Sequence, residues 1–221
     1  MFIAAEERNE QMASEPRLRI LLVGASGTLG RAVAAELGQR HDIVTAGRNG
    51  GDVRMDIADA ASVIAGIRQA GPIDAVACAA GAANFSPLHE MVPAVMSDSL
   101  YGLGLASKLF GQVNLALAAR DTLRDGGSIT LTSGVLGDHP VVTGSSASMA
   151  GGGVEAFVRA AAIELPRGLR INVVSPTVLT ESMPSIGALF RGFEPMPAAR
   201  AALAFARSIE GRQTGQVYKM Y

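Results

Sequence analysis

The stretch VGASGTLGRA, residues 23–32, decides the fold class of this chain. It overlaps the end of RLRILLVG (17–24), a short aliphatic run that is typical of a buried strand in a parallel sheet. It leads into TLGRAVAAELGQR (28–40), which is apolar on one face, as an amphipathic helix is. A glycine-rich turn therefore joins a buried strand to a helix.

Three glycines in this turn predict a phosphate site. Gly24, Gly27 and Gly30 leave no Cβ between the backbone and a ligand. The helix N-terminus adds free N–H groups and the positive end of the helix dipole. A tight turn without a ligand is the alternative, and the strand–turn–helix context favours a dinucleotide pyrophosphate. The residues expected to contact it are Gly24, Ser26, Gly27, Thr28, Leu29 and Gly30.

The rest of the chain alternates between strands and helices. We expect further strands at 42–47, 52–56, 73–81, 126–134, 169–176 and 215–221. We expect further helices at 58–71, about 100–123, 145–165 and 197–210. Strands and helices that alternate at this spacing form βαβ units. The predicted fold is therefore α/β, a Rossmann-like doubly wound parallel sheet of about seven strands with helices on both faces.

Composition limits the class of protein. Of 221 residues 48% are hydrophobic and 18% are charged, so we expect one globular domain over 18–221. A net charge of -1 without a basic run argues against a nucleic-acid partner, and no apolar run reaches the ~20 residues of a membrane helix. The single Cys fits a reducing compartment, so we expect a cytoplasmic protein. Residues 1–17 read as a flexible tail, of which 1–11 are a vector remnant or an over-extended start.

The end of the second strand indicates which nucleotide binds. In an NAD site an acidic residue closes this strand and binds the ribose 2′-hydroxyl. Here the strand ends TAGRN, with Gly47 in the place of the acid and Arg48 after it. A guanidinium suits a 2′-phosphate, and Arg31 on the first helix is a second candidate clamp. We therefore expect NADP(H) to be preferred, with NAD(H) possible; a solvated surface Arg48 is the alternative.

With these features in place, the chain resembles the short-chain dehydrogenase/reductase family from about Leu18 to Tyr218. The motifs that carry the resemblance are GASGTLG (24–30), AAG (79–81), TLTSG (130–134) and INVVSPTVLT (171–180). The resemblance implies hydride transfer between NAD(P) and a small carbonyl or alcohol substrate.

The resemblance also implies individual cofactor contacts. It assigns Asp56 to the adenine. At two strand ends it assigns cofactor contacts to Ala79, Ala80, Gly81, Pro176, Val178 and Thr180. Two positions depart from the family pattern, because Ala79 replaces an Asn and Thr177 replaces a Gly.

The catalytic residues of the family are only partly present. Ser133 matches the family's Ser. The family's Tyr and Lys, four residues apart on one helix face, fall on Ala147 and Gly151, and residues 145–157 contain neither a Tyr nor a Lys. Lys108 stands where the resemblance places the family's Asn. We expect no metal site, because the three His residues are scattered.

Three interpretations of the missing pair stay open. In the first, the protein is a reductase in which Lys108 donates the proton and Ser133 binds the substrate oxygen; His139 is another candidate donor. In the second, the protein is an NADP(H)-binding sensor or scaffold without activity. In the third, the glycines 151–153 allow close helix packing. The resemblance implies self-association, as a dimer or tetramer, through the 100–123 and 147–165 helices.

Overall fold

Seven parallel strands form one sheet in the computed structural model, which describes residues 16–221. The predicted tail, 1–17, lies almost entirely outside the described residues. The sheet order is β3-β2-β1-β4-β5-β6-β7, which confirms the predicted doubly wound arrangement. The strands are β1 (Arg19–Val23), β2 (Asp42–Gly47), β3 (Val53–Arg54), β4 (Ile73–Cys78), β5 (Leu123–Thr132), β6 (Arg170–Pro176) and β7 (Val217–Met220).

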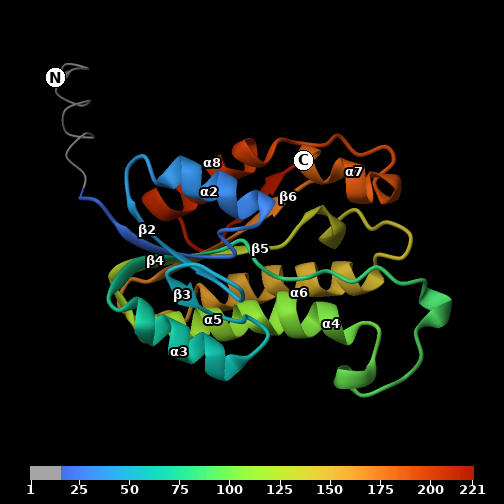
Figure 1. Cartoon of the computed structure of the whole chain (residues 1–221), viewed down its shortest axis with the longest axis horizontal. Coiled ribbons are helices and arrows are strands. Elements are labelled where there is room, and N and C mark those ends of the chain that lie inside the picture. The colour runs from blue at the N-terminus through green and yellow to red at the C-terminus, as the bar shows by residue number, and fades with distance from the viewer. Residues whose placement is uncertain (1–15) are drawn as a thin grey trace.

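Helices cover both faces of the sheet (Figure 1). On one face lie α2 (Thr28–Leu37), the short α7 (Met183–Ile186) and α8 (Ala198–Glu210). On the other lie α3 (Ala60–Ala70), the short α4 (Gly102–Gly104), α5 (Gly111–Arg120) and α6 (Ser145–Ala161). This layering explains why the strands read as continuous apolar runs, since both of their faces are buried.

The two faces of β1 belong to two separate hydrophobic clusters. Leu21 and Val23 pack with residues of α3, α5 and α6, whereas Ile20 and Leu22 pack with residues of α2 and α8. Alternate side chains of a strand point to opposite faces, so one aliphatic run anchors both helix layers. The end of β1, where the glycine turn begins, is held firmly as a result.

The largest departure from the sequence prediction lies in the helix expected at 100–123. The structure replaces it with α4, a π-helical turn at Leu105–Phe110 and α5, and β5 already begins at Leu123. π-Helical turns are rare and occur often at functional sites. Other expected helices are shorter: α2 ends before Gly38, and α6 ends at Ala161, ahead of Pro166.

Candidate active site

The glycine turn is shaped by two close backbone contacts. Gly24 has φ +85°, and a Cβ there would lie 2.9 Å from the carbonyl carbon of Ala79. A Cβ on Gly30 would lie 2.0 Å from the carbonyl oxygen of Gly24. Any side chain at these positions would push the turn away from β4 or from its own helix. The turn therefore takes a form that only glycine allows.

Free N–H groups at the start of α2 point out of this turn. Gly27 is the N-cap, with no side-chain cap, and the first intrahelical bond runs from the Arg31 N–H to the Gly27 carbonyl at 2.9 Å. The N–H groups of Thr28, Leu29 and Gly30 donate to no backbone group of residues 16–221. A pyrophosphate fits this arrangement, because it accepts such bonds and carries negative charge.

Two arginines lie at the edge of the sheet beyond β2. Arg48 is exposed, and its guanidinium has no hydrogen-bond or ion-pair partner within the described part of the chain. The Arg54 side chain donates to the backbone carbonyl of Arg48 at 2.9 Å, which brings a second guanidinium to the same stretch of chain. Arg31, in contrast, donates to the carbonyl of Ser26 and so folds back on the glycine turn.

The two acids near this edge are held by their own surroundings. Asp52 accepts from the backbone N–H of Thr45 at 2.9 Å and from its hydroxyl at 2.8 Å. These bonds keep the pKa of Asp52 below its usual value. Asp56 accepts from the N–H of Ala58 at 3.0 Å. Asp52 therefore serves β2 and leaves Arg48 without an acidic neighbour among these contacts.

A cavity of about 330 Å³ opens at the carboxyl ends of β4, β5 and β6. Eight of the residues proposed from the sequence line it: Leu29, Ala79, Ala80, Gly81, Lys108, Ser133, Pro176 and Val178. Thr180 does not line it; this residue is exposed, and its N–H donates to the Met196 carbonyl at 2.8 Å. Ligands of doubly wound sheets bind at this edge.

Lys108 enters the cavity from the π-helical turn. Its backbone packs so closely on Gly81 that a Cβ there would lie 3.0 Å from the Lys108 Cα. Its ammonium has no hydrogen-bond or ion-pair partner among residues 16–221, and burial lowers the pKa of this lysine. Ala147 and Gly151 line the same cavity. Lys108 thus shares one space with the two positions that lack Tyr and Lys.

Ser133 already has a hydrogen-bond partner, which the sequence did not suggest. Its hydroxyl donates to Glu155 Oε1 at 2.9 Å. Glu155 is 4% exposed, and its other oxygen pairs with Arg159 at 3.2 Å. The signal that was missed is spacing, because Glu155 follows Gly151 by four residues and so lies on the same helix face.

The three glycines of α6 have different surroundings. A Cβ on Gly151 would be 3.9 Å from the Ser133 Cβ, and a Cβ on Gly152 would meet nothing within 4 Å. A Cβ on Gly153 would lie 2.9 Å from Leu109 Cδ2. Only Gly153 therefore serves close packing, and Gly151 leaves space above Ser133.

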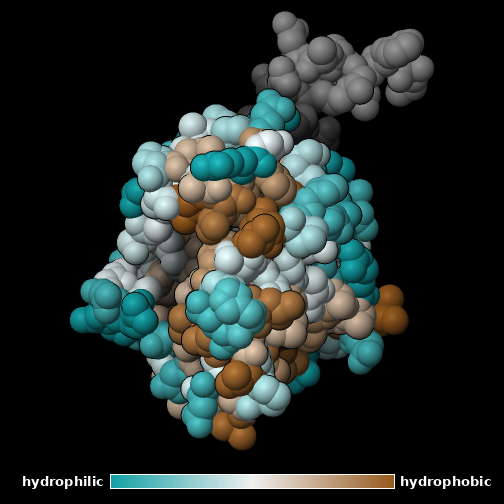
Figure 2. Space-filling model, turned by 90° about the vertical axis from the view of Figure 1, so that its right-hand side faces the viewer, coloured by the Kyte–Doolittle hydropathy of each residue, from teal (hydrophilic) through white to brown (hydrophobic). Residues whose placement is uncertain are grey.

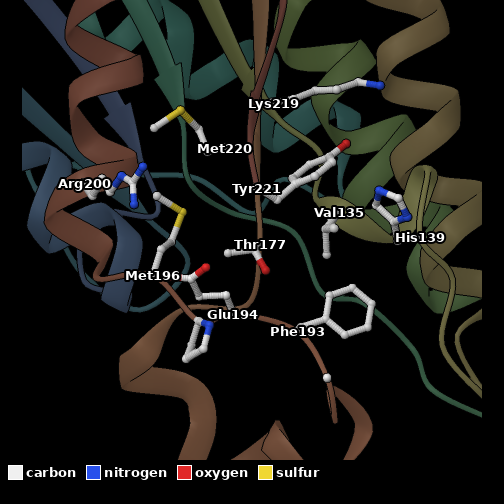
Figure 3. Close-up of a pocket in the computed structure, with 12 residues that line it drawn as sticks. Val135, His139, Thr177, Phe193, Glu194, Met196, Arg200, Lys219, Met220 and Tyr221 are labelled. Carbon is white, nitrogen blue, oxygen red and sulfur yellow. The ribbon is translucent and has the colours of Figure 1, made fainter.

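A second cavity, of about 530 Å³, adjoins the first through Val135 and Thr177 (Figure 3). His139 lies on one side of it and Arg200 on the other, with Tyr221 between them. The His139 ring meets the Tyr221 ring edge-on at 5.5 Å. His139 lines only this cavity, so the structure does not bring it together with Ser133.

Asp138 binds two residues at the rim of the second cavity. Its carboxylate accepts from the Lys219 ammonium and from the Tyr221 hydroxyl, and these bonds lower its pKa. Burial, with this carboxylate beside it, raises the pKa of Tyr221 to about 12. The tyrosine is thereby tied to the rim as a neutral hydrogen-bond donor.

Hydrophobic side chains surround the mouth of the first cavity. Phe190 lines it and meets Phe85 and Phe193 edge-on, with ring centroids 6.4 and 5.5 Å apart. Hydrophobic residues gather on this end of the molecule (Figure 2). The neighbouring segment 88–103 exposes Leu88, Val92, Val95, Met96, Leu100 and Leu103.

Two classes of site are missing from residues 16–221. No three His, Cys, Asp or Glu side chains there are grouped to hold a metal ion. Among the same residues, none of the helices combines the length and the apolar character needed to span a bilayer.

A glycine turn with free N–H groups and a cavity at the carboxyl edge of a doubly wound sheet are typical of the Rossmann class of nucleotide-binding proteins. A family model described as enoyl-(acyl carrier protein) reductase matches residues 18–218. The chain belongs to the short-chain dehydrogenase/reductase family, whose members are oxidoreductases that use nicotinamide dinucleotides.

Solved structures agree with this assignment. The protein lin1944 from Listeria innocua is 48% identical over 92% of this chain and 100% of its own, with a TM-score of 0.88. A small-chain dehydrogenase is 25% identical over 93% of this chain and 96% of its own, at a TM-score of 0.77. A small-chain dehydrogenase in complex with NADPH, 24% identical over 93% and 97% of the two chains, has a TM-score of 0.80 and shows the shared fold. No curated protein is significantly similar to this chain.

Proposed function

We propose that this protein is an NADP(H)-dependent oxidoreductase acting on a small carbonyl or alcohol substrate. The observation that carries the proposal is the cavity that joins Lys108 and Ser133 to the strand ends next to the glycine turn. When bound, the nicotinamide supplies or accepts the hydride. Arg48, with Arg54 beside it, would bind the 2′-phosphate of NADP(H), and a solved structure with a similar fold holds NADPH.

The reacting oxygen would lie between two side chains of this chain. Ser133 accepts a hydrogen bond from the hydroxyl group of the alcohol form, and in the direction of reduction Lys108 donates to the carbonyl oxygen the proton that the family's Tyr donates elsewhere. A partly buried amine with a lowered pKa exchanges its proton more readily near neutral pH than an exposed one. Gly151 leaves space next to Ser133 in the cavity that Lys108 also lines.

Turnover tests the proposal directly. Protein saturated with NADPH is assayed for cofactor oxidation against aldehydes, ketones and quinones; no oxidation above background with any of them would reject the proposed activity. Lys108→Ala should lower kcat about 100-fold or more, the usual contribution of a positioned acid. NADPH affinity, measured by fluorescence, should be unchanged in this variant. Full activity of Lys108→Ala would remove Lys108 from the mechanism.

A cofactor-binding sensor or scaffold without activity is the second candidate. Ala147 and Gly151 favour this second candidate, because neither side chain can donate the proton that the family's Tyr donates. Tight NADPH binding with no turnover on the whole panel would select this candidate.

We also propose that the protein self-associates through the helices expected at 100–123 and 147–165. An open groove of about 520 Å³ runs between α5 and α6, lined by Leu117, Phe157, Ala161 and Leu165 among others. Leu117 in this groove is 44% exposed, and Ile163, just after α6, is 85% exposed; exposed apolar side chains on these two elements favour a partner. Light scattering should give a dimer or tetramer, and Leu117→Glu should shift it to smaller species.

A further inference from the structure

The α6 face that borders the cavity carries an acid in place of the expected Tyr and Lys. Ala147 and Gly151 line the cavity, and Glu155 follows one turn later on the same face. We infer that Glu155 is a positioning residue: it determines whether Ser133 donates or accepts the hydrogen bond that it forms with the substrate oxygen. The inference rests on the proposed function only in treating this cavity as the substrate site.

One hydrogen atom decides what Ser133 can offer. A serine hydroxyl has one hydrogen and two lone pairs. Ser133 donates its hydroxyl hydrogen to Glu155 Oε1, so the Oγ atom presents lone pairs to the cavity that Ser133 lines. Lone pairs accept a hydrogen from a hydroxyl group and repel a carbonyl oxygen. The cavity therefore binds the alcohol form of a substrate in preference to the carbonyl form.

The surroundings of Glu155 favour its carboxylate over any ligand as the acceptor of the Ser133 hydrogen bond. Arg159 pairs with Glu155 Oε2 at 3.2 Å, so both carboxylate oxygens accept hydrogen bonds. The turn Val135–Gly137 covers the carboxylate, since a Cβ on Gly137 would lie 3.8 Å from Oε1. A buried charged acceptor forms a stronger hydrogen bond than a neutral ligand does, so the Ser133 hydroxyl keeps donating to Glu155 when a ligand binds.

Ligand preference tests this inference without turnover. The full chain, free of cofactor, is titrated with cyclohexanol and with cyclohexanone while the Ser133 and Gly134 amide signals are followed by NMR. Wild-type protein should bind the alcohol more tightly. In Glu155→Gln an amide N–H can donate to Ser133 Oγ, which frees the hydroxyl hydrogen for the ketone. The ratio of the two dissociation constants should then move toward the ketone by roughly 10-fold, the size of one neutral hydrogen bond.

Two matched variants separate positioning from a general structural effect. Glu164→Gln changes an exposed carboxylate beyond the end of the same helix and should leave the ratio unchanged. In a Ser133→Ala background, Glu155→Gln should have no effect on the ratio, because Glu155 acts through Ser133. If Glu155→Gln does not fold, Ser133→Ala alone should abolish the preference for cyclohexanol.

Each of three results would overturn the inference: an unchanged ratio in Glu155→Gln, a shift that persists without the Ser133 hydroxyl, or no binding of either probe to the wild type. A shifted ratio in a protein that turns over no substrate would support the role of Glu155 and reject the proposed activity. The proposed role of Glu155 and the proposed oxidoreductase activity can therefore be rejected independently of each other.

Discussion

The glycine turn after β1 and the first turns of α6 differ in how they meet the family pattern. Residues 24–30 match it position by position, whereas Ala147 and Gly151 leave out the two side chains that the family uses for proton transfer. The first region acts through backbone N–H groups and close contacts, so two of its positions, Gly24 and Gly30, are restricted to glycine. The second acts through side chains, which can be supplied from another element. The comparison teaches that a site built from backbone groups keeps its sequence pattern, whereas a site built from side chains can lose its usual residues while the fold is kept.

The largest expected effect is at the glycine turn. Gly30→Ala would place a Cβ 2.0 Å from the Gly24 carbonyl oxygen, so the turn must shift. We expect a loss of about 1–3 kcal/mol in stability from overpacking. NADPH affinity should fall at least about 100-fold, because more than one phosphate hydrogen bond is lost. Urea unfolding and fluorescence titration measure the two effects.

Gly152→Ala is the matched control for this variant, because Gly152 is also a helical glycine but has nothing within 4 Å of its would-be Cβ. It should bind NADPH as the wild type does. Equal NADPH affinities in Gly30→Ala and Gly152→Ala would break the comparison, because the turn would then not be fixed by backbone contacts.

A smaller effect is expected at Arg48, where the proposed cofactor contact is made by a side chain. Arg48→Gln should weaken NADPH binding roughly 10- to 100-fold, the effect of losing charge-assisted hydrogen bonds to a phosphate. NADH affinity should not change, because NADH has no 2′-phosphate. Arg212→Gln, an exposed arginine far along the chain after α8, serves as the control. Equal losses for the two cofactors would remove the 2′-phosphate assignment.

The burial of Lys108 in the cavity should lower the stability of the folded protein. Burial depresses the pKa of Lys108 in the folded state below its ordinary value of 10.5. Between the folded-state and unfolded-state pKa of Lys108, the unfolded chain binds more protons than the folded one, so the free energy of unfolding rises with pH. The destabilisation by the buried ammonium is therefore largest below the folded-state pKa. Lys108→Met should therefore raise Tm by a few degrees at neutral pH, and the gain should vanish above pH 10.5.

Lys219→Met provides the contrast by calorimetry. Lys219 is exposed and its ammonium pairs with Asp138, so its removal should bring no gain. A stabilisation of the same size in both variants would mean that burial of Lys108 is not the cause.

The sequence predicts much of this fold for identifiable reasons. Dense aliphatic runs and the turn glycines are local signals, and they indicate the strands and the first crossover. The π-helical turn that carries Lys108 has no such signal, because it depends on packing against Gly81. The bond between Ser133 and Glu155 joins residues 22 positions apart, so the helical spacing of Gly151 and Glu155 indicates only the helix face and not the partner. Sequence therefore indicates the fold and the residues at its strand ends well, and the side-chain contacts around Ser133 and Lys108 only in part.

The smallest expected effect concerns the glycines of α6 at positions 151–153 and tests which of them are needed for packing. Gly152→Ala should raise the free energy of unfolding by about 0.5–1 kcal/mol, since alanine favours a helix and the added Cβ meets nothing within 4 Å. Gly153→Ala gains the same propensity but brings its Cβ 2.9 Å from Leu109, so the two effects offset each other. Urea unfolding of both variants measures the difference. Equal gains would show that none of the glycines serves packing, and a loss in Gly152→Ala would reveal a partner that approaches α6 at this position in the assembled protein.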